Sequence, residues 1–245
     1  MAEKHLQRRS ALKWILSGCA ALAGLVWGLV PARLRAAVND LFPTRTVDDD
    51  AFRFDPASGD LLWPGNRREP YALRLDGLVE SPLDLAYAQL RALPQTAHTV
   101  DFHCVEGWDV QDVPWSGVAF QDLFAKVRLK PGATHVVFHS ISPTKSRVSG
   151  TDHYIESFPL SELLRPELNC LLALDLEGAP LPHDRGAPAR VVCPFDLAYK
   201  SIKFVNRVEF TDHSVPGWWT RANPIYPVDA PVPPRRLRVK DPRRG

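Results

Sequence analysis

The four cysteines of this chain form none of the familiar metal-binding spacings. No two lie as Cys-x-x-Cys, none begins a Cys-x-x-Cys-His segment, and no Cys/His zinc pattern occurs. These absences disfavour zinc, covalently attached haem and iron–sulfur clusters as cofactors. Cys19 lies near the N-terminus, which leaves Cys104, Cys170 and Cys193 in the remainder of the chain.

An excess of charge of one sign is also missing. The chain has 30 Lys and Arg against 28 Asp and Glu, a net charge of +2. Six of those basic residues and one acid fall within residues 1–37, so the rest carries 24 basic and 27 acidic side chains, a balance of −3. This balance argues against a general binder of nucleic acid or anionic lipid. Hydrophobic residues make up 45% of the chain, enough for a buried core.

The N-terminal segment resembles a twin-arginine export signal. Arg8 and Arg9 precede an apolar run, residues 14–30, which contains no charge. We therefore predict that residues 1–37 direct the protein to the periplasm, with cleavage near residues 36 and 37. The alternative is an uncleaved membrane anchor, for which a run of 17 residues is short.

The remaining pattern predicts an α+β domain with a mixed sheet. Residues 38–60 form an extended segment leading into the domain, with a solvated acidic turn at 48–50. Helices are expected from Ser81 to about residue 93, from Ser116 to residue 127, and over 160–164. The Pro- and Arg-rich tail, 227–245, is expected on the surface or disordered. We expect strands over 71–76, 99–104, 135–139, 171–176, 189–193 and 201–210, and a polar loop over 140–153.

Cys104 stands where an apolar strand-like run meets a loop containing Gly107 and Trp108. A thiol at a strand end can face a cavity, and a soft thiolate is a good ligand for a heavy metal. The alternative is a free cysteine of the core. Cys170 and Cys193 lie in apolar runs and are most simply small buried residues, or a disulfide in an oxidising compartment.

Basic residues gather around two later junctions of loop and strand. Arg185 and Arg190 flank a Gly/Pro loop, and Lys200 and Lys203 flank Ser201. Guanidinium forks, ammonium groups and a hydroxyl suit a phosphate or pyrophosphate. From spacing alone, solvated surface charges are the favoured interpretation, because charged residues are mostly exposed.

Four motifs follow one another along the chain. They are Cys-Val-Glu-Gly-Trp at 104–108, Trp-Ser-Gly at 115–117, Gly-Ala-Pro-Ala-Arg-Val-Val at 186–192 and Tyr-Lys-Ser-Ile-Lys at 199–203. In this order they resemble the sulfite oxidase family of molybdopterin enzymes. The resemblance covers residues 61–226 and implies the single mixed-sheet molybdopterin-binding domain of that family.

The resemblance implies roles for the matching residues. Cys104 would bind the molybdenum of a molybdenum-molybdopterin cofactor. Tyr226, which follows Pro-Gly-Trp-Trp at 216–219, is similar to a family segment near the substrate pocket and is expected to be catalytic. The implied cofactor-binding residues are Asn66, Arg185, Arg190, Lys200, Ser201, Ile202 and Lys203.

Two positions depart from the family pattern. Arg185 stands where the family usually has His or Asn, and Gly65 stands where sulfite oxidases have an arginine that helps to hold the sulfite anion. An anion in a desolvated pocket needs paired charge, so Gly65 weakens the case for sulfite. Oxygen-atom transfer on a sulfoxide or a sulfite-like small molecule is therefore expected.

The resemblance also implies an external electron partner, because the sequence shows no haem module and no flavin or dinucleotide fingerprint. In exported relatives that partner is a cytochrome or a haem-carrying membrane subunit. Two alternatives to this enzyme remain open. One is a non-catalytic binding domain of the same fold. The other is a thiol enzyme in which Cys104 is the nucleophile and His103, His98 or His139 the base.

Overall fold

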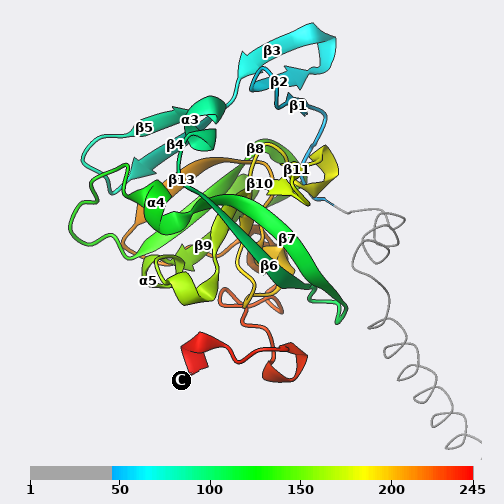
Figure 1. The fold of residues 1–245 in the computed structure, drawn as a ribbon, viewed down its shortest axis with the longest axis vertical. Coiled ribbons are helices and arrows are strands. Elements are labelled where there is room, and N and C mark those ends of the chain that lie inside the picture. The colour runs from blue at the N-terminus through cyan, green and yellow to red at the C-terminus, as the bar shows by residue number, and fades with distance from the viewer. Residues whose placement is uncertain (1–45, 245) are drawn as a thin grey trace, which may run out of the picture. The chain divides into compact units, whose positions relative to one another are not determined.

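The protein is described here by a computed structural model that covers residues 46–244. The predicted export segment, residues 1–37, lies outside this range. The α+β class is confirmed: the described residues form three sheets and a few short helices (Figure 1). No helix within residues 46–244 has the length and apolar character needed to cross a membrane.

A small antiparallel sheet comes first in the chain. It consists of β1 (Arg53–Asp55), β2 (Asp60–Trp63) and β3 (Arg67–Pro70), and a single 3₁₀ turn, Pro64–Asn66, joins the last two strands. Gly65 adopts φ 75° in that turn, a backbone conformation that favours glycine. The predicted extended segment therefore ends in a hairpin.

The second sheet carries the motifs that the sequence singles out. Its strand order is β11-β10-β7-β6, and β12 pairs with β10 on the other side. Every residue of β10 is buried or nearly so, because the apolar run 171–176 has neighbours on both faces. The strands are β6 (Gln95–His103), β7 (Asp109–Ala119), β10 (Leu171–Leu176), β11 (Ala179–Pro180) and β12 (Arg190–Val192).

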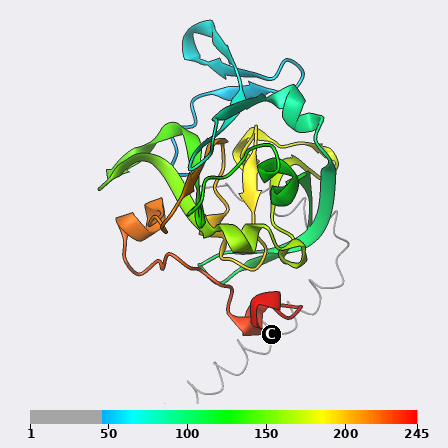
Figure 2. The same cartoon turned by 90° about the vertical axis from the view of Figure 1, so that its left-hand side faces the viewer.

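The third sheet is mixed, as the sequence predicts. Its order is β5-β4-β13-β8-β9, in which β13 runs parallel to β4 and all other neighbours are antiparallel. Figure 2 shows it beside the second sheet. Its strands are β4 (Ala72–Gly77), β5 (Leu83–Ala86), β8 (His135–Val148), β9 (Thr151–Pro159) and β13 (Val205–Thr211).

The helices are short. Their apolar residues join one core with the inner faces of the strands; Phe120 lies 5.3 Å from Phe138 and Phe124 lies 5.0 Å from Phe210 between ring centroids. The helices are α3 (Tyr87–Arg91), α4 (Phe120–Phe124), α5 (Leu160–Leu163) and α6 (Trp218–Ala222).

Three local predictions are wrong, and strand pairing explains each one. Residues 83–86 form β5 against β4 instead of opening a helix, since Leu83 and Leu85 alternate with polar neighbours. β7 continues through Ser116 and Ala119 because its whole length pairs with β6 and β10. The segment 140–153, predicted as a polar loop, belongs mostly to the long β8–β9 hairpin.

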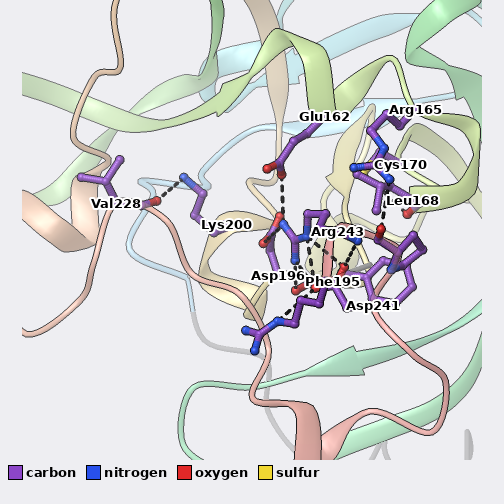
Figure 3. Close-up of polar contacts among 12 residues, drawn as sticks. Glu162, Arg165, Leu168, Cys170, Phe195, Asp196, Lys200, Val228, Asp241 and Arg243 are labelled. Atoms are coloured by element: carbon purple, nitrogen blue, oxygen red, sulfur yellow. Dashed lines mark hydrogen bonds and ion pairs between the residues drawn. The ribbon is translucent and has the colours of Figure 1, made fainter.

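The C-terminal tail packs onto the domain, and the expectation of a surface or disordered segment is wrong for its buried residues. Ala230, Val232 and Asp241 are all buried. Arg243 binds Asp241, Asp196 and Glu162 as well as the Phe195 carbonyl (Figure 3). Buried carboxylates therefore pair with tail arginines, which fixes the tail against the domain.

Candidate active site

Cys104 occupies the turn of the β6–β7 hairpin. Its N–H donates to the Trp108 carbonyl at 2.9 Å, and the N–H of Gly107 donates back to the Cys104 carbonyl at 3.1 Å. Gly107 takes φ 98°, which suits this tight turn. The thiol is half-buried and forms no disulfide with the other cysteines of residues 46–244. A closed turn thus presents one cysteine sulfur at the end of a long hairpin.

The environment keeps this thiol protonated in the protein alone. Burial raises the pKa of Cys104, and nearby backbone N–H groups and Arg236 offset only part of that effect. A protonated thiol is a weak nucleophile, whereas a bound metal would remove its proton. The raised pKa therefore argues against Cys104 acting as a free nucleophile.

The three histidines proposed as a base for a thiol enzyme are engaged elsewhere or unfavourable. His103 is buried and its Nδ1 lies 2.6 Å from Asp109. His139 contacts Glu209 and His153 in the third sheet. Burial lowers the pKa of His98, which makes it a weaker base. The contacts of these histidines therefore do not favour a Cys/His catalytic pair.

A tail arginine that the sequence did not single out clamps the Cys104 turn. Arg236 Nη2 donates to the carbonyls of Cys104 at 2.8 Å and Trp108 at 3.0 Å, and to the Asp109 carboxylate at 2.5 Å. Arg238 binds Asp101 at 2.6–2.7 Å and also Asp112, which secures the hairpin stem. No local pattern could have indicated this contact, because it spans more than 100 residues.

Arg236→Ala is expected to raise the alkylation rate of Cys104 in the cofactor-free protein by about tenfold. Each hydrogen bond to a charged group stabilises a structure by about 1.5–3 kcal/mol, so loss of these bonds lets the turn open and exposes the thiol. Exposure relieves the burial that raises the pKa of Cys104, and this effect is larger than the loss of the Arg236 charge, which lowers that pKa. The rate is measured with iodoacetamide and peptide mass spectrometry. Arg235→Ala, at the exposed neighbouring arginine, should leave the rate unchanged. Equal rates in both variants would contradict a clamp.

Arg190 forms the centre of a buried basic cluster. Its guanidinium donates to the Arg185 carbonyl at 3.0 Å and the Ser201 carbonyl at 3.1 Å. It also lies over the rings of Phe102 and Trp115, at 5.4 and 5.0 Å from their centroids. Phe102 precedes Cys104 by two residues on β6, so this contact joins the basic cluster to the strand that ends at the thiol.

Gly186 allows Arg190 and Lys203 to lie side by side. Its φ is 110°, and a Cβ there would come within 3.0 Å of the Lys203 side chain and 3.2 Å of the Arg190 Cβ. The Lys203 ammonium donates to the Asp184 carbonyl at 2.7 Å. The first residue of this motif is therefore glycine for two reasons, backbone conformation and space.

The cluster is short of negative charge. Burial together with Arg185 lowers the pKa of Arg190 to about 10. Burial together with Arg190 lowers the pKa of Lys203 to about 8. Arg190 Nε and Trp115 Nε1 are buried donors that find no hydrogen-bond partner among residues 46–244. A polyanionic group that accepts hydrogen bonds would relieve both deficits, so these residues fit the phosphate end of a molybdopterin.

Asp48 is a buried polar residue of this region, although the sequence predicts that it is solvated. The expected solvated turn is wrong for Asp48, which is 3% exposed and accepts a hydrogen bond from Thr46 at 2.7 Å. Burial raises its pKa, although the charge of Lys203 acts in the opposite direction. Its Oδ1 has no hydrogen-bond partner within the described part of the chain. It offers a buried acceptor beside the basic cluster.

The structure does not bring every predicted residue to this cluster. The Lys200 ammonium is buried against Glu156 at 3.0 Å and the Ser157 carbonyl at 2.5 Å. The Ile202 side chain lies in the apolar core, and Ser201 reaches Arg190 through its backbone carbonyl. The cofactor roles of Lys200 and Ile202 remain predictions from resemblance.

Asn66 and Tyr226 also lie apart from the cluster in their contacts. Asn66 is exposed at the β2–β3 turn. Figures 1 and 2 place this hairpin at the opposite end of the described fold from the C-terminal segment, which contacts the Cys104 turn. The Tyr226 ring packs on Tyr199 and Trp219 at 5.4 and 5.3 Å between centroids. Its predicted catalytic role remains a prediction.

Arg190→Met is expected to lower the molybdenum content of the purified protein by at least about tenfold, because it removes a buried fork for a phosphate. Arg190→Lys should recover part of the content, since it keeps the charge without the fork. Molybdenum per chain is measured by mass spectrometry of the metal, with Arg128→Met at an exposed position as control. Undiminished content in Arg190→Met would contradict the assignment.

Comparison with known proteins gives similarities that cover most of the chain. Residues 61–219 match the family described as the oxidoreductase molybdopterin binding domain. The chain is 34% identical over 248 residues to the protein-methionine-sulfoxide reductase catalytic subunit MsrP of Gluconobacter oxydans, covering 91% of this chain and 75% of the relative. MsrP of Ralstonia nicotianae is 31% identical over 247 residues, with coverages of 90% and 74%.

Two further similarities are more limited. The uncharacterized oxidoreductase YuiH of Bacillus subtilis is 32% identical over 149 residues, which cover 61% of this chain and 69% of that protein. The crystal structure of the sulfane dehydrogenase SoxCD from Paracoccus pantotrophus superposes with a TM-score of 0.49 at 23% identity, covering 59% of this chain and 39% of the other.

Proposed function

Since this chain belongs to the oxidoreductase molybdopterin-binding domain family, and is a molybdenum-dependent oxidoreductase with a molybdenum-molybdopterin cofactor, we propose that it transfers an oxygen atom to or from a small substrate at a metal held by Cys104. The observation that carries this proposal is the half-buried thiol presented by a closed turn that Arg236 clamps. A thiol in a closed turn is a preorganised soft ligand.

The chain's own residues hold and orient the cofactor. Arg190, Arg185 and Lys203 would bind its anionic end, and Trp115 Nε1 would donate a hydrogen bond into the same region. The bound cofactor supplies two-electron redox chemistry and exchange of an oxygen atom. The protein would fix its position by keeping the thiol in the closed turn and by packing the Phe102 and Trp115 rings against the Arg190 guanidinium.

A sulfoxide is the substrate that the observations favour. Two relatives that share most of this chain are named protein-methionine-sulfoxide reductases. Gly65, which has no side chain, stands where the resemblance implies an arginine that holds sulfite. This argument rests on the resemblance alone, because the β2–β3 turn lies away from the Cys104 turn in the fold (Figure 1). Val105 and Trp108 are 38% and 50% exposed beside Cys104, and such apolar surface suits the carbon atoms on either side of the sulfur in methionine sulfoxide.

We further propose that the protein is exported and takes electrons from a separate haem protein, a cytochrome or a haem-carrying membrane subunit. The paired arginines before the apolar run at 14–30 support export by the twin-arginine route to the periplasm. That route carries folded proteins, which suits an enzyme loaded with its cofactor before export.

The proposal is tested with the full chain produced in a host that makes molybdopterin. We expect about one molybdenum per chain, and we expect methionine sulfoxide to drive oxidation of a reduced redox dye. Sulfite oxidation should be at least about tenfold slower, by analogy with anion sites that lack their paired charge. Protein without molybdenum would instead support a non-catalytic domain of the same fold. Fast sulfite turnover would overturn the substrate assignment.

A further inference from the structure

Two cysteines outside the proposed active site face each other across a pair of strands. β10 and β12 are antiparallel, with Leu171 opposite Val192 and Leu172 opposite Val191. The next position of the same register places Cys170 opposite Cys193. Both cysteines pack in the main apolar core, Cys193 buried and Cys170 partly exposed.

The hydrogen-bond pattern defines which kind of pair they form. The N–H of Val191 donates to the Ile202 carbonyl at 3.0 Å, away from β10, and the Cys193 carbonyl likewise accepts from Asp196 at 3.1 Å. Cys170 and Cys193 therefore occupy a non-hydrogen-bonded position. Cα atoms in such pairs are about 4.5 Å apart, within the range of roughly 4.4–6.8 Å that a disulfide requires.

The thiols of Cys170 and Cys193 differ in their exposure to solvent. They are close enough to interact with each other, and burial raises the pKa of Cys193 well above its ordinary value. The Cys170 thiol donates to the Leu168 carbonyl at 3.7 Å, at the edge of the tail region (Figure 3). An oxidant would therefore meet Cys170 first, with Cys193 behind it as the resolving thiol.

We propose that Cys170 and Cys193 are a redox modification site, in which a low-molecular-weight disulfide converts them to a cross-strand disulfide. The Cys170 thiolate attacks one sulfur of the external disulfide, which gives a mixed disulfide and releases one thiol. Cys193 loses its proton, attacks the Cys170 sulfur and releases the second thiol. Two protein thiols are oxidised, one external disulfide is reduced, and both protons end on the released thiols.

The bond would close a loop of 24 residues, 170–193, that contains Arg185 and Arg190. It would hold the strand of the basic cluster to β10 and restrict the unfolded chain. The bond forms between these two thiols alone and needs neither Cys104 nor the cofactor, so only the source of the external disulfide rests on the proposed export. An oxidising compartment would supply the external disulfide.

The test treats the full chain, with and without its cofactor, with glutathione disulfide or with dithiothreitol. We expect oxidation to remove two alkylatable thiols, to yield a peptide linking Cys170 to Cys193, and to raise the melting temperature by about 5–10 °C. Cys170→Ser, at the partly exposed position, should lose both the link and the shift, as should Cys193→Val.

Persistence of the temperature shift in Cys170→Ser would overturn the proposal. So would full alkylation of both cysteines after oxidation, or a link from either of them to Cys104. Because these readouts are masses and melting temperatures, their outcome does not depend on whether the protein reduces a sulfoxide.

Discussion

Cys104→Ser is expected to lower turnover per bound molybdenum by more than about 100-fold. Loss of a residue that only orients a metal ligand typically costs about 10–100-fold, and Cys104 is proposed to be the ligand itself. A serine hydroxyl is harder and less readily ionised than a thiol, so it is a poor replacement at a soft site. Turnover is measured with a reduced dye and methionine sulfoxide, divided by the molybdenum content of each preparation.

Two comparisons make this result specific. Cys170→Ser, kept under reducing conditions, should turn over at the wild-type rate, because Cys170 lies in the apolar core and not in the hairpin turn. If Cys104→Ser retains its molybdenum but loses turnover, the pterin end holds the cofactor and the thiol tunes the metal. Turnover within about threefold of wild type would exclude Cys104 as the essential ligand.

Lys200→Met is expected to destabilise the protein by about 3–5 kcal/mol, the usual cost of removing one partner of a buried ion pair. Glu156 is 1% exposed and its carboxylate lies 3.0 Å from the Lys200 ammonium. A Cβ on Gly217 would approach that carboxylate to 2.3 Å, so the glycine provides its space. Unfolding in urea at pH 8 measures the effect, and the double variant with Glu156→Gln should regain most of the stability.

The same pair gives the protein a defined response to pH. Burial, partly offset by Lys200, raises the pKa of Glu156 to about 7, above its ordinary value of 4.5. As pH rises from 4.5, the unfolded state ionises first, so stability is lost until about pH 7 and is then constant. The loss is at most about 3 kcal/mol. Glu156→Gln should remove it; a dependence that survives in this variant would implicate another group.

The sequence indicated Cys104 and Arg190 of the candidate site, but it did not indicate the residues that hold them in position. Short motifs located Cys104 at a strand end and Arg190 in a basic loop, because each residue lies within a local pattern of strand, glycine and proline. The family resemblance also predicts that Lys200 binds the cofactor, although its ammonium contacts Glu156, 44 residues away in the chain. Arg236 could not be found, since an arginine in a Pro/Arg-rich tail has no pattern that identifies its partner.

The same limit applies to the fold. The strand predicted over 171–176 has these bounds in the structure, and the strand predicted over 71–76 is found at 72–77; an apolar run and an alternating pattern indicated them. Residues 83–86 carry a good helix-start signal, yet they pair with β4, because a cross-strand partner outweighs a cap. Residues 140–153 are polar on average and still form a hairpin, since pairing of β8 with β9 satisfies their backbone groups.

The Arg236 clamp has a consequence for biosynthesis. Arg236, which fixes the Cys104 turn, follows Cys104 by 132 residues in the chain. At ~5–20 residues per second, a ribosome needs on the order of ten seconds to supply it after the cysteine. The Cys104 turn of a nascent chain therefore lacks the Arg236 contacts, and we expect it to reach its final shape only after Arg236 has been translated. Cofactor insertion would then be a post-translational event.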